Sequence, residues 1–150
     1  MIPLRDNQAS RRLTLITVTL IVANVAVFIH EASLGNGLEK FVYQYAMIPA
    51  RLTSALEGGG QVARLPYASG APPALETIVT SMFLHGGILH LAGNMLYLFI
   101  FGAAVEEAMG HVRFLLFYLI SGIASALAMA AFTPHSTVPV IGASGACILP

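Results

Sequence analysis

The chain has 150 residues, of which 57% are hydrophobic and only 9% are charged. Soluble domains carry roughly 25% charged residues, so these charges are too few to build a water-facing surface. The formal net charge is zero, which leaves nucleic-acid binding without electrostatic support. The single cysteine, Cys147, excludes an internal disulfide. This composition indicates a membrane protein.

Long apolar segments follow one another along the chain. The first three have about the length that crosses a hydrocarbon core of roughly 30 Å. The last is shorter, and a half-spanning helix leaves backbone groups unpaired in lipid. We therefore expect a single all-α membrane domain, truncated at its C-terminus, with about four helices of which the last is incomplete. The expected helices cover residues 13–29, 84–105, 112–132 and 138–150.

Basic residues and loop residues predict the topology. Arg5, Arg11 and Arg12 precede the first helix, and the positive-inside rule then makes the N-terminus cytoplasmic. Residues 31–81 would form an external loop, punctuated by glycines and prolines. Within it, residues 38–56 are partly amphipathic, which fits either an ordinary structured loop or a loop resting on the outer membrane face.

Three polar residues interrupt the second apolar segment, in the pattern H-x-x-x-x-H-x-x-x-N. His90 and Asn94 are four residues apart and share one face of a helix. His85 lies beside Gly86 and Gly87, where we expect the helix to start. Polar side chains are costly inside a bilayer. A lone histidine would be assigned to packing between helices, but these three together indicate a functional site.

A second cluster, Gly142-Ala143-Ser144-Gly145, lies near the start of the last apolar segment. A serine near a helix N-terminus lies where the macrodipole favours developing negative charge. The flanking glycines remove bulk, so that a substrate carbonyl or a neighbouring helix can approach. The alternative is a small-residue packing motif, because G-x-S-G alone is a weak signal.

Together the two clusters fit acyl transfer. Ser144 would be the nucleophile. Its backbone N–H and the side chains of His90 and Asn94 would bind the oxyanion, where each donor is worth roughly 3 kcal/mol in the transition state. A general base is also required, because an unaided serine hydroxyl is a weak nucleophile.

The sequence SMFLHGGILHLAGNMLYLFIFG, then GAAVEEAMGHVRFLLFYLISG, then VIGASGA resembles the rhomboid family of intramembrane serine proteases. The resemblance runs from about Ile78 to Ala146. It implies a bundle of six or more spans with a Ser–His dyad in a water-filled cavity below the outer surface. It also implies that the protein cleaves transmembrane segments of other proteins, without metal or cofactor, in a membrane that we take to be the bacterial inner membrane.

The motif positions imply a role for each residue. Ser144 matches the nucleophile, His90 and Asn94 match the oxyanion-binding pair, and His85 matches a further histidine upstream of that pair. The structural positions of the motifs are Glu106, Gly102, Gly110, Gly142 and Gly145.

The chain departs from the family pattern in three ways. The family's catalytic histidine lies on the sixth helix, whereas this chain ends six residues after Ser144. His30, His111 and His135 fit interfacial, turn and loop positions better than that of a base, so the 150 residues alone are expected to be inactive. The residues 147–150 are not the usual small ones. There is no tryptophan for the family's Trp-Arg pair, and either Arg51 or Arg64 could anchor the first loop.

Two other functions remain open. A rhomboid-like pseudoprotease, or an inactive remnant, would bind membrane helices without cutting them, and the gene sequence beyond codon 150 distinguishes it from a protease. A histidine metal site is disfavoured, because His85 and His90 are five residues apart and not at the i, i+4 spacing of two ligands on one helix face. The expected partners are transmembrane substrates and the lipid bilayer.

Overall fold

The computed structural model describes residues 14–58, 67 and 69–142. The α-helices of this part are α1 (Leu15–Ser33), α2 (Leu38–Tyr45), α3 (Pro49–Leu56), α4 (Glu76–Thr80), α5 (Ile88–Tyr97), α6 (Ala103–Met109) and α7 (His111–Phe132). Short turns lie at η1 (Gly35–Gly37) and η3 (Ser81–Phe83), and a π-helical turn, η4 (Leu98–Gly102), joins α5 to α6. No strand occurs in the described residues, where an isolated bridge joins Met47 to Val140. The expected all-α class is confirmed.

In the described part of the chain, three helical stretches are long and apolar enough to span a membrane. They are Leu15–Ser33, Ile88–Met109 and His111–Phe132. The first continues past its expected end at residue 29. The expected start of the second at residue 84 is wrong, because Leu84 is extended and Gly86 and Gly87 lie in an irregular turn before α5. Of the expected fourth helix, residues 138–142 are not helical and the remainder lies outside the described residues.

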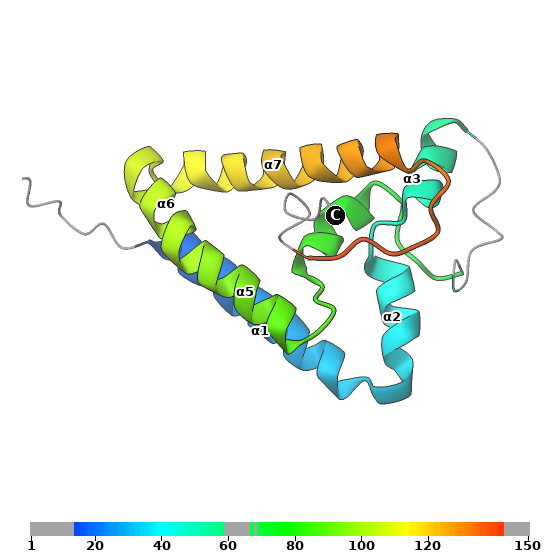
Figure 1. Cartoon of the computed structure of the whole chain (residues 1–150), viewed down its shortest axis with the longest axis horizontal. Helices are drawn as coiled ribbons and strands as arrows, with labels where there is room; N and C mark the ends of the chain where they lie inside the picture. The colour runs from blue at the N-terminus through cyan, green and yellow to red at the C-terminus, as the bar shows by residue number, and fades with distance from the viewer. Residues whose placement is uncertain (1–13, 59–66, 68, 143–150) are drawn as a thin grey trace, which may run out of the picture.

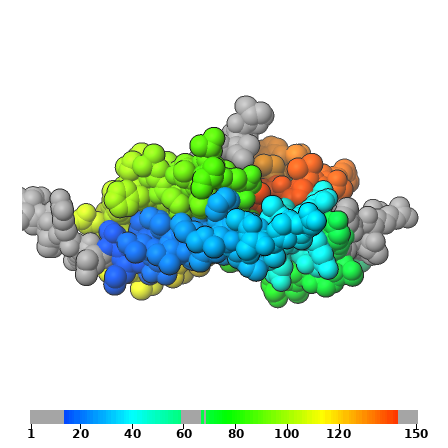
Figure 2. Space-filling model, turned by 90° about the horizontal axis from the view of Figure 1, so that it is seen from below, coloured from blue at the N-terminus to red at the C-terminus, as the bar shows by residue number. Residues whose placement is uncertain are grey.

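The spans form two arms. Figure 1 shows α1 and α5 side by side along one arm and α7 along the other, with α6 at the corner. The chain turns between α6 and α7 at Gly110, whose φ of 83° is a conformation that favours glycine. Figure 2 shows the contact between α1 and α5 from another side. The loop helices α2 to α4 fill the open end between the arms (Figure 1).

A buried carboxylate joins the corner to the start of α1. The first turn of a helix has backbone N–H groups without partners, and α1 has no side-chain cap of its own. The Glu106 carboxylate accepts hydrogen bonds from the Ile16 N–H at 2.9 Å and from the Thr17 N–H and hydroxyl, each at 2.7 Å. His111 Nδ1 lies 2.5 Å from the same carboxylate. Glu106 therefore caps α1 and connects it to both α6 and α7.

The loop between α1 and α4 is organised around Arg51. This side chain is buried, and its guanidinium donates hydrogen bonds to the carbonyl oxygens of Gln44 and Pro72. It thus joins α3 to the end of α2 and to the segment before α4. The sequence did not distinguish Arg51 from Arg64 as an anchor. The structure shows Arg51 in this role, and Arg64 lies outside the described residues.

The amphipathic stretch 38–56 is two helices, with a break at residues 46–48. All three residues of the break are fully or almost fully buried. The segment after α7 packs on this break, because the Val140 N–H donates to the Met47 carbonyl at 2.8 Å and the Ala50 N–H donates to the Ser136 carbonyl at 2.9 Å. The stretch is therefore a structured platform for the returning chain.

Candidate functional site

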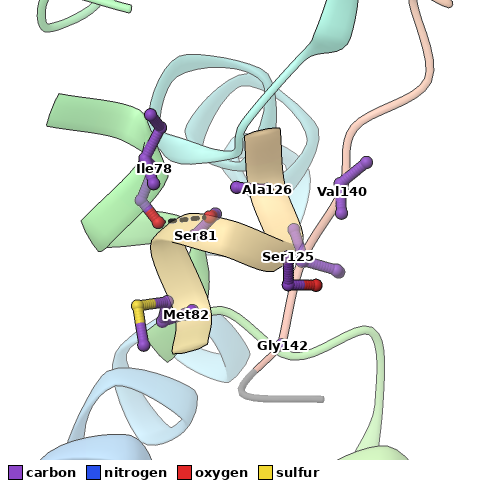
Figure 3. Close-up of a pocket in the computed structure, with 9 residues that line it drawn as sticks. Ile78, Ser81, Met82, Ser125, Ala126, Val140 and Gly142 are labelled. Atoms are coloured by element: carbon purple, nitrogen blue, oxygen red, sulfur yellow. Dashed lines mark hydrogen bonds between the residues drawn. The ribbon is translucent and has the colours of Figure 1, made fainter. Parts of the chain in front are cut away.

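The chain returns from α7 to the start of α5. After the contact with Met47, the Gly142 N–H donates to the Ser81 carbonyl at 2.9 Å. Figure 3 shows this segment, with Val140 and Gly142 running past Ser81 and past Ser125 of α7. These backbone contacts place Gly142, the first residue of the G-A-S-G motif, beside the polar residues at the start of α5.

Gly142 lies directly against two of the polar residues predicted from the sequence. A Cβ atom at this position would be 2.7 Å from Cε1 and Nε2 of His90 and 3.4 Å from Nδ2 of Asn94. The φ of Gly142 is +104°, which side chains rarely adopt. Glycine is therefore required here both for the backbone conformation and for the close approach. Ser144 and Gly145 lie outside the described residues.

A hydrogen bond from the turn before α5 favours one tautomer of His90. The Gly86 N–H donates to Nδ1 of His90 at 3.4 Å. A neutral imidazole that accepts at Nδ1 carries its proton on Nε2, and Nε2 is the nitrogen that faces Gly142. Asn94 is buried, and its Nδ2 has no hydrogen-bond partner in the described part of the chain. Two N–H donors therefore converge beside Gly142.

His85 lies behind His90. It is 4% exposed, its Nδ1 is 3.1 Å from the Phe83 carbonyl, and its ring packs edge-on against that of His90 with centroids 5.4 Å apart. Burial lowers the pKa of His85 below its ordinary value of 6.5. The imidazole is therefore neutral at pH 7, and it supports His90 through ring contact.

A pH dependence of stability follows from this buried histidine. The unfolded chain binds a proton at His85 as the pH falls through about 6.5, whereas the folded chain resists protonation. Above a pH of about 6.5, His85 therefore does not reduce the free energy of unfolding. As the pH falls below this value, His85 lowers the free energy of unfolding. Thermal unfolding in detergent is expected to show a weaker loss of stability on acidification in His85→Gln than in the wild type. The matched control, His135→Gln at an exposed position, should keep the wild-type slope, and an unchanged slope in His85→Gln would contradict the assignment.

Two hollows adjoin the site. A cavity of about 20 Å³ beside Gly142 is lined in part by Ser81 and Ser125 (Figure 3) and has room for a single water. A larger groove of about 590 Å³ lies between α5–α6 and α7. Asn94 and Ser121 are polar residues of its mostly apolar lining. Asn94 thus lies where the site opens between the two arms.

The other predicted structural residues lie away from this point. A Cβ at Gly102 would be 2.8 Å from Leu98 Cδ1 and 3.3 Å from Phe114 Cζ, so the glycine allows α7 to pack closely on η4. The remaining histidines also lie elsewhere: the ring of His30 packs on Phe41 at 5.2 Å, and His135 is exposed. Within the described residues, no group of three or more His, Cys, Asp or Glu side chains is arranged to hold a metal.

One buried acidic residue near the site was not predicted from the sequence. Glu31, near the end of α1, is 2% exposed, and its carboxylate accepts a hydrogen bond from the His85 backbone N–H at 3.2 Å. A carboxylate just after an apolar segment resembles an ordinary polar flank. No local signal distinguishes it, because its partner lies 54 positions away.

The fold and the site define an integral membrane protein of apolar helices with polar groups clustered inside. The chain belongs to the rhomboid family, since the model of the rhomboid domain matches residues 72–148. The family resemblance predicted from the sequence is confirmed.

Curated proteins that are similar to this chain also carry rhomboid names. RHOMBOID-like protein 6, mitochondrial, of Arabidopsis thaliana is 31% identical over 151 residues, which cover 89% of this chain and 48% of the relative. Rhomboid protease GluP of Bacillus subtilis is 48% identical over 120 residues, covering 74% of this chain and 23% of the relative. Inactive rhomboid protein 1 of Drosophila melanogaster is 38% identical over 73 residues, covering 49% and 5%. The chain thus spans about half or less of these relatives. No solved structure matches it.

Proposed function

We propose that the chain carries the nucleophile and the oxyanion-binding groups of an intramembrane serine endopeptidase. Ser144 is the nucleophile, and the oxyanion is bound by Nε2–H of His90, Nδ2–H of Asn94 and the Ser144 backbone N–H. One observation carries the proposal: the backbone of Gly142, two residues before Ser144, lies against both side chains. Rhomboid protease GluP, a relative named as a protease, adds support.

The chemistry follows from these positions. The Ser144 hydroxyl oxygen attacks the substrate carbonyl carbon, the carbonyl oxygen becomes the oxyanion, and the serine proton passes to a general base. Donors already aimed at the oxyanion lower the barrier, because no reorganisation is needed as charge develops. The base then protonates the leaving amine, and water releases the acyl group. The family resemblance assigns the base to a histidine beyond Pro150.

The position of the site along a membrane span indicates the substrate class. Asn94 belongs to the spanning stretch Ile88–Met109 and is buried. A peptide bond that reaches this amide must itself enter the membrane region. The proposed substrates are therefore transmembrane segments of other proteins.

Cross-linking tests whether the nucleophile lies beside the oxyanion donors, independently of activity. In a Cys147→Ser background, the pair Asn94→Cys and Ser144→Cys should be joined efficiently by a short bismaleimide. The matched control pairs Ser144→Cys with Leu89→Cys, since Leu89 is on the same helix but 85% exposed. Equal yields for the two pairs would place Ser144 away from the donors and refute the proposed site.

Cleavage of a fluorogenic transmembrane substrate tests the function itself. The product of the gene's full reading frame should cleave the substrate, and Ser144→Ala should reduce the rate by several orders of magnitude, as loss of a triad member does in serine hydrolases. The 150-residue chain alone should show no Ser144-dependent cleavage. Such cleavage by the 150 residues would contradict the assignment of the base to a later segment.

A second candidate is a rhomboid-like protein that binds membrane helices without cutting them. The relative named Inactive rhomboid protein 1 favours it, because the name shows that related chains can lack activity. In this case, the full product would bind a transmembrane peptide equally well with and without the substitution Ser144→Ala, and neither form would release a cleaved product.

A further inference from the structure

Glu31 is a buried carboxylate that the proposed chemistry does not use. It is 2% exposed within the membrane-spanning helix α1. A charged group in such a place is costly unless it is paired or hydrogen-bonded. Its oxygens lie 3.2 and 3.4 Å from the backbone nitrogen of His85, which donates its hydrogen to them. The carboxylate therefore connects α1 to the irregular turn before α5.

This turn supplies a hydrogen-bond donor to His90. The amide that follows His85 belongs to Gly86, and it donates to Nδ1 of His90 at 3.4 Å. Two successive amide N–H groups thus have different acceptors. The N–H of His85 donates to Glu31 on α1, and the N–H of Gly86 donates to Nδ1 of His90. Because the turn has no helical backbone to hold it, an anchor from another span limits how far the Gly86 amide can swing away from His90.

We propose that Glu31 is a positioning residue for the candidate site: by holding the His85 amide, its carboxylate keeps the Gly86 N–H on Nδ1 of His90 and so keeps the His90 proton on Nε2, facing Gly142. The catalytic value of this arrangement rests on the proposed function, because an oxyanion needs a donor at Nε2. The hydrogen bonds from the His85 amide to Glu31 and from the Gly86 amide to His90 are independent of the proposed function.

Histidine-selective nitrogen NMR of the 150-residue chain in detergent provides the test. At a pH of about 8, well above the ordinary imidazole pKa, the wild type should show the His90 proton on Nε2. In Glu31→Leu, where the acceptor is lost, the His90 signals should report a mixture of tautomers. The His85 amide should exchange its hydrogen about tenfold faster or more, because a hydrogen bond to a charged group is removed.

Two matched variants separate positioning from folding. Glu31→Gln keeps an acceptor oxygen at the same place and should restore the wild-type tautomer. Glu39→Leu makes the same change at an exposed position on α2 and should alter neither signal. The proposal is overturned if Glu31→Leu leaves the tautomer and the His85 exchange unchanged, or if both Glu31 variants lose protection along the whole of α1. Since the measurement needs no cleavage, failure of the proposed function would appear separately, in the Ser144 assay.

Discussion

Glu106→Ala is expected to lower the free energy of unfolding by about 4–5 kcal/mol or more, because the three hydrogen bonds that the carboxylate accepts from α1 are lost, each worth about 1.5 kcal/mol or more. The lost donors are the Ile16 N–H and the N–H and hydroxyl of Thr17. All three would remain at a helix start without a side-chain cap of its own. Thermal or denaturant-induced unfolding in detergent measures the effect.

The adjacent carboxylate supplies the control for Glu106. Glu107→Ala removes the same group one position further along α6, where the side chain is only half-buried, and should change the stability little. Glu106→Gln should fall between the two, because its amide oxygen keeps one acceptor while its NH₂ group faces the donors. Equal losses for Glu106→Ala and Glu107→Ala would mean that the capping of α1 does not contribute to stability.

Gly142→Ala is expected to separate the G-A-S-G motif from its oxyanion donors. The new methyl group would lie 2.7 Å from the His90 ring, and the φ of +104° would be strained in alanine. Either the backbone at position 142 or the His90 ring must therefore move away from the other. A displacement of about 1 Å at a reacting group can reduce a rate by about 10²-fold, and we expect at least that loss of Ser144-dependent cleavage in the full gene product.

Cross-linking reports the same displacement without activity. The yield between cysteines at positions 94 and 144 should fall in Gly142→Ala. Gly37→Ala is the matched control, because Gly37 has an ordinary φ of −83°, is exposed, and would bring its Cβ no closer than 3.9 Å to Leu34. If Gly142→Ala keeps both the rate and the yield of Gly37→Ala, then the close approach to His90 has no role in the site.

Features that depend on local physics could be predicted from the sequence. Apolar segments must become helices in lipid, because only a helix satisfies each backbone group within its own segment. This rule predicted three of the spans to within a few residues. The start of α5 at Ile88 was predicted only to within a few residues, because the apolar segment extends back to residue 84 although Gly86 and Gly87 were expected to mark the helix start. The pattern of His90 and Asn94, four residues apart, indicated a shared helix face for the same local reason.

The sequence by itself thus determined the membrane class, the rhomboid family and the residues that could do chemistry. Only the tertiary structure decided which of them meet and what holds them: Gly142 against His90, Glu31 on the amide of His85, Glu106 on the first turn of α1, and Arg51 as the anchor of the loop. The physical reason is distance along the chain. A buried carboxylate must find a donor, but which backbone amide supplies it, 54 or 89 positions away, depends on how the spans pack and leaves no periodic signal in the sequence.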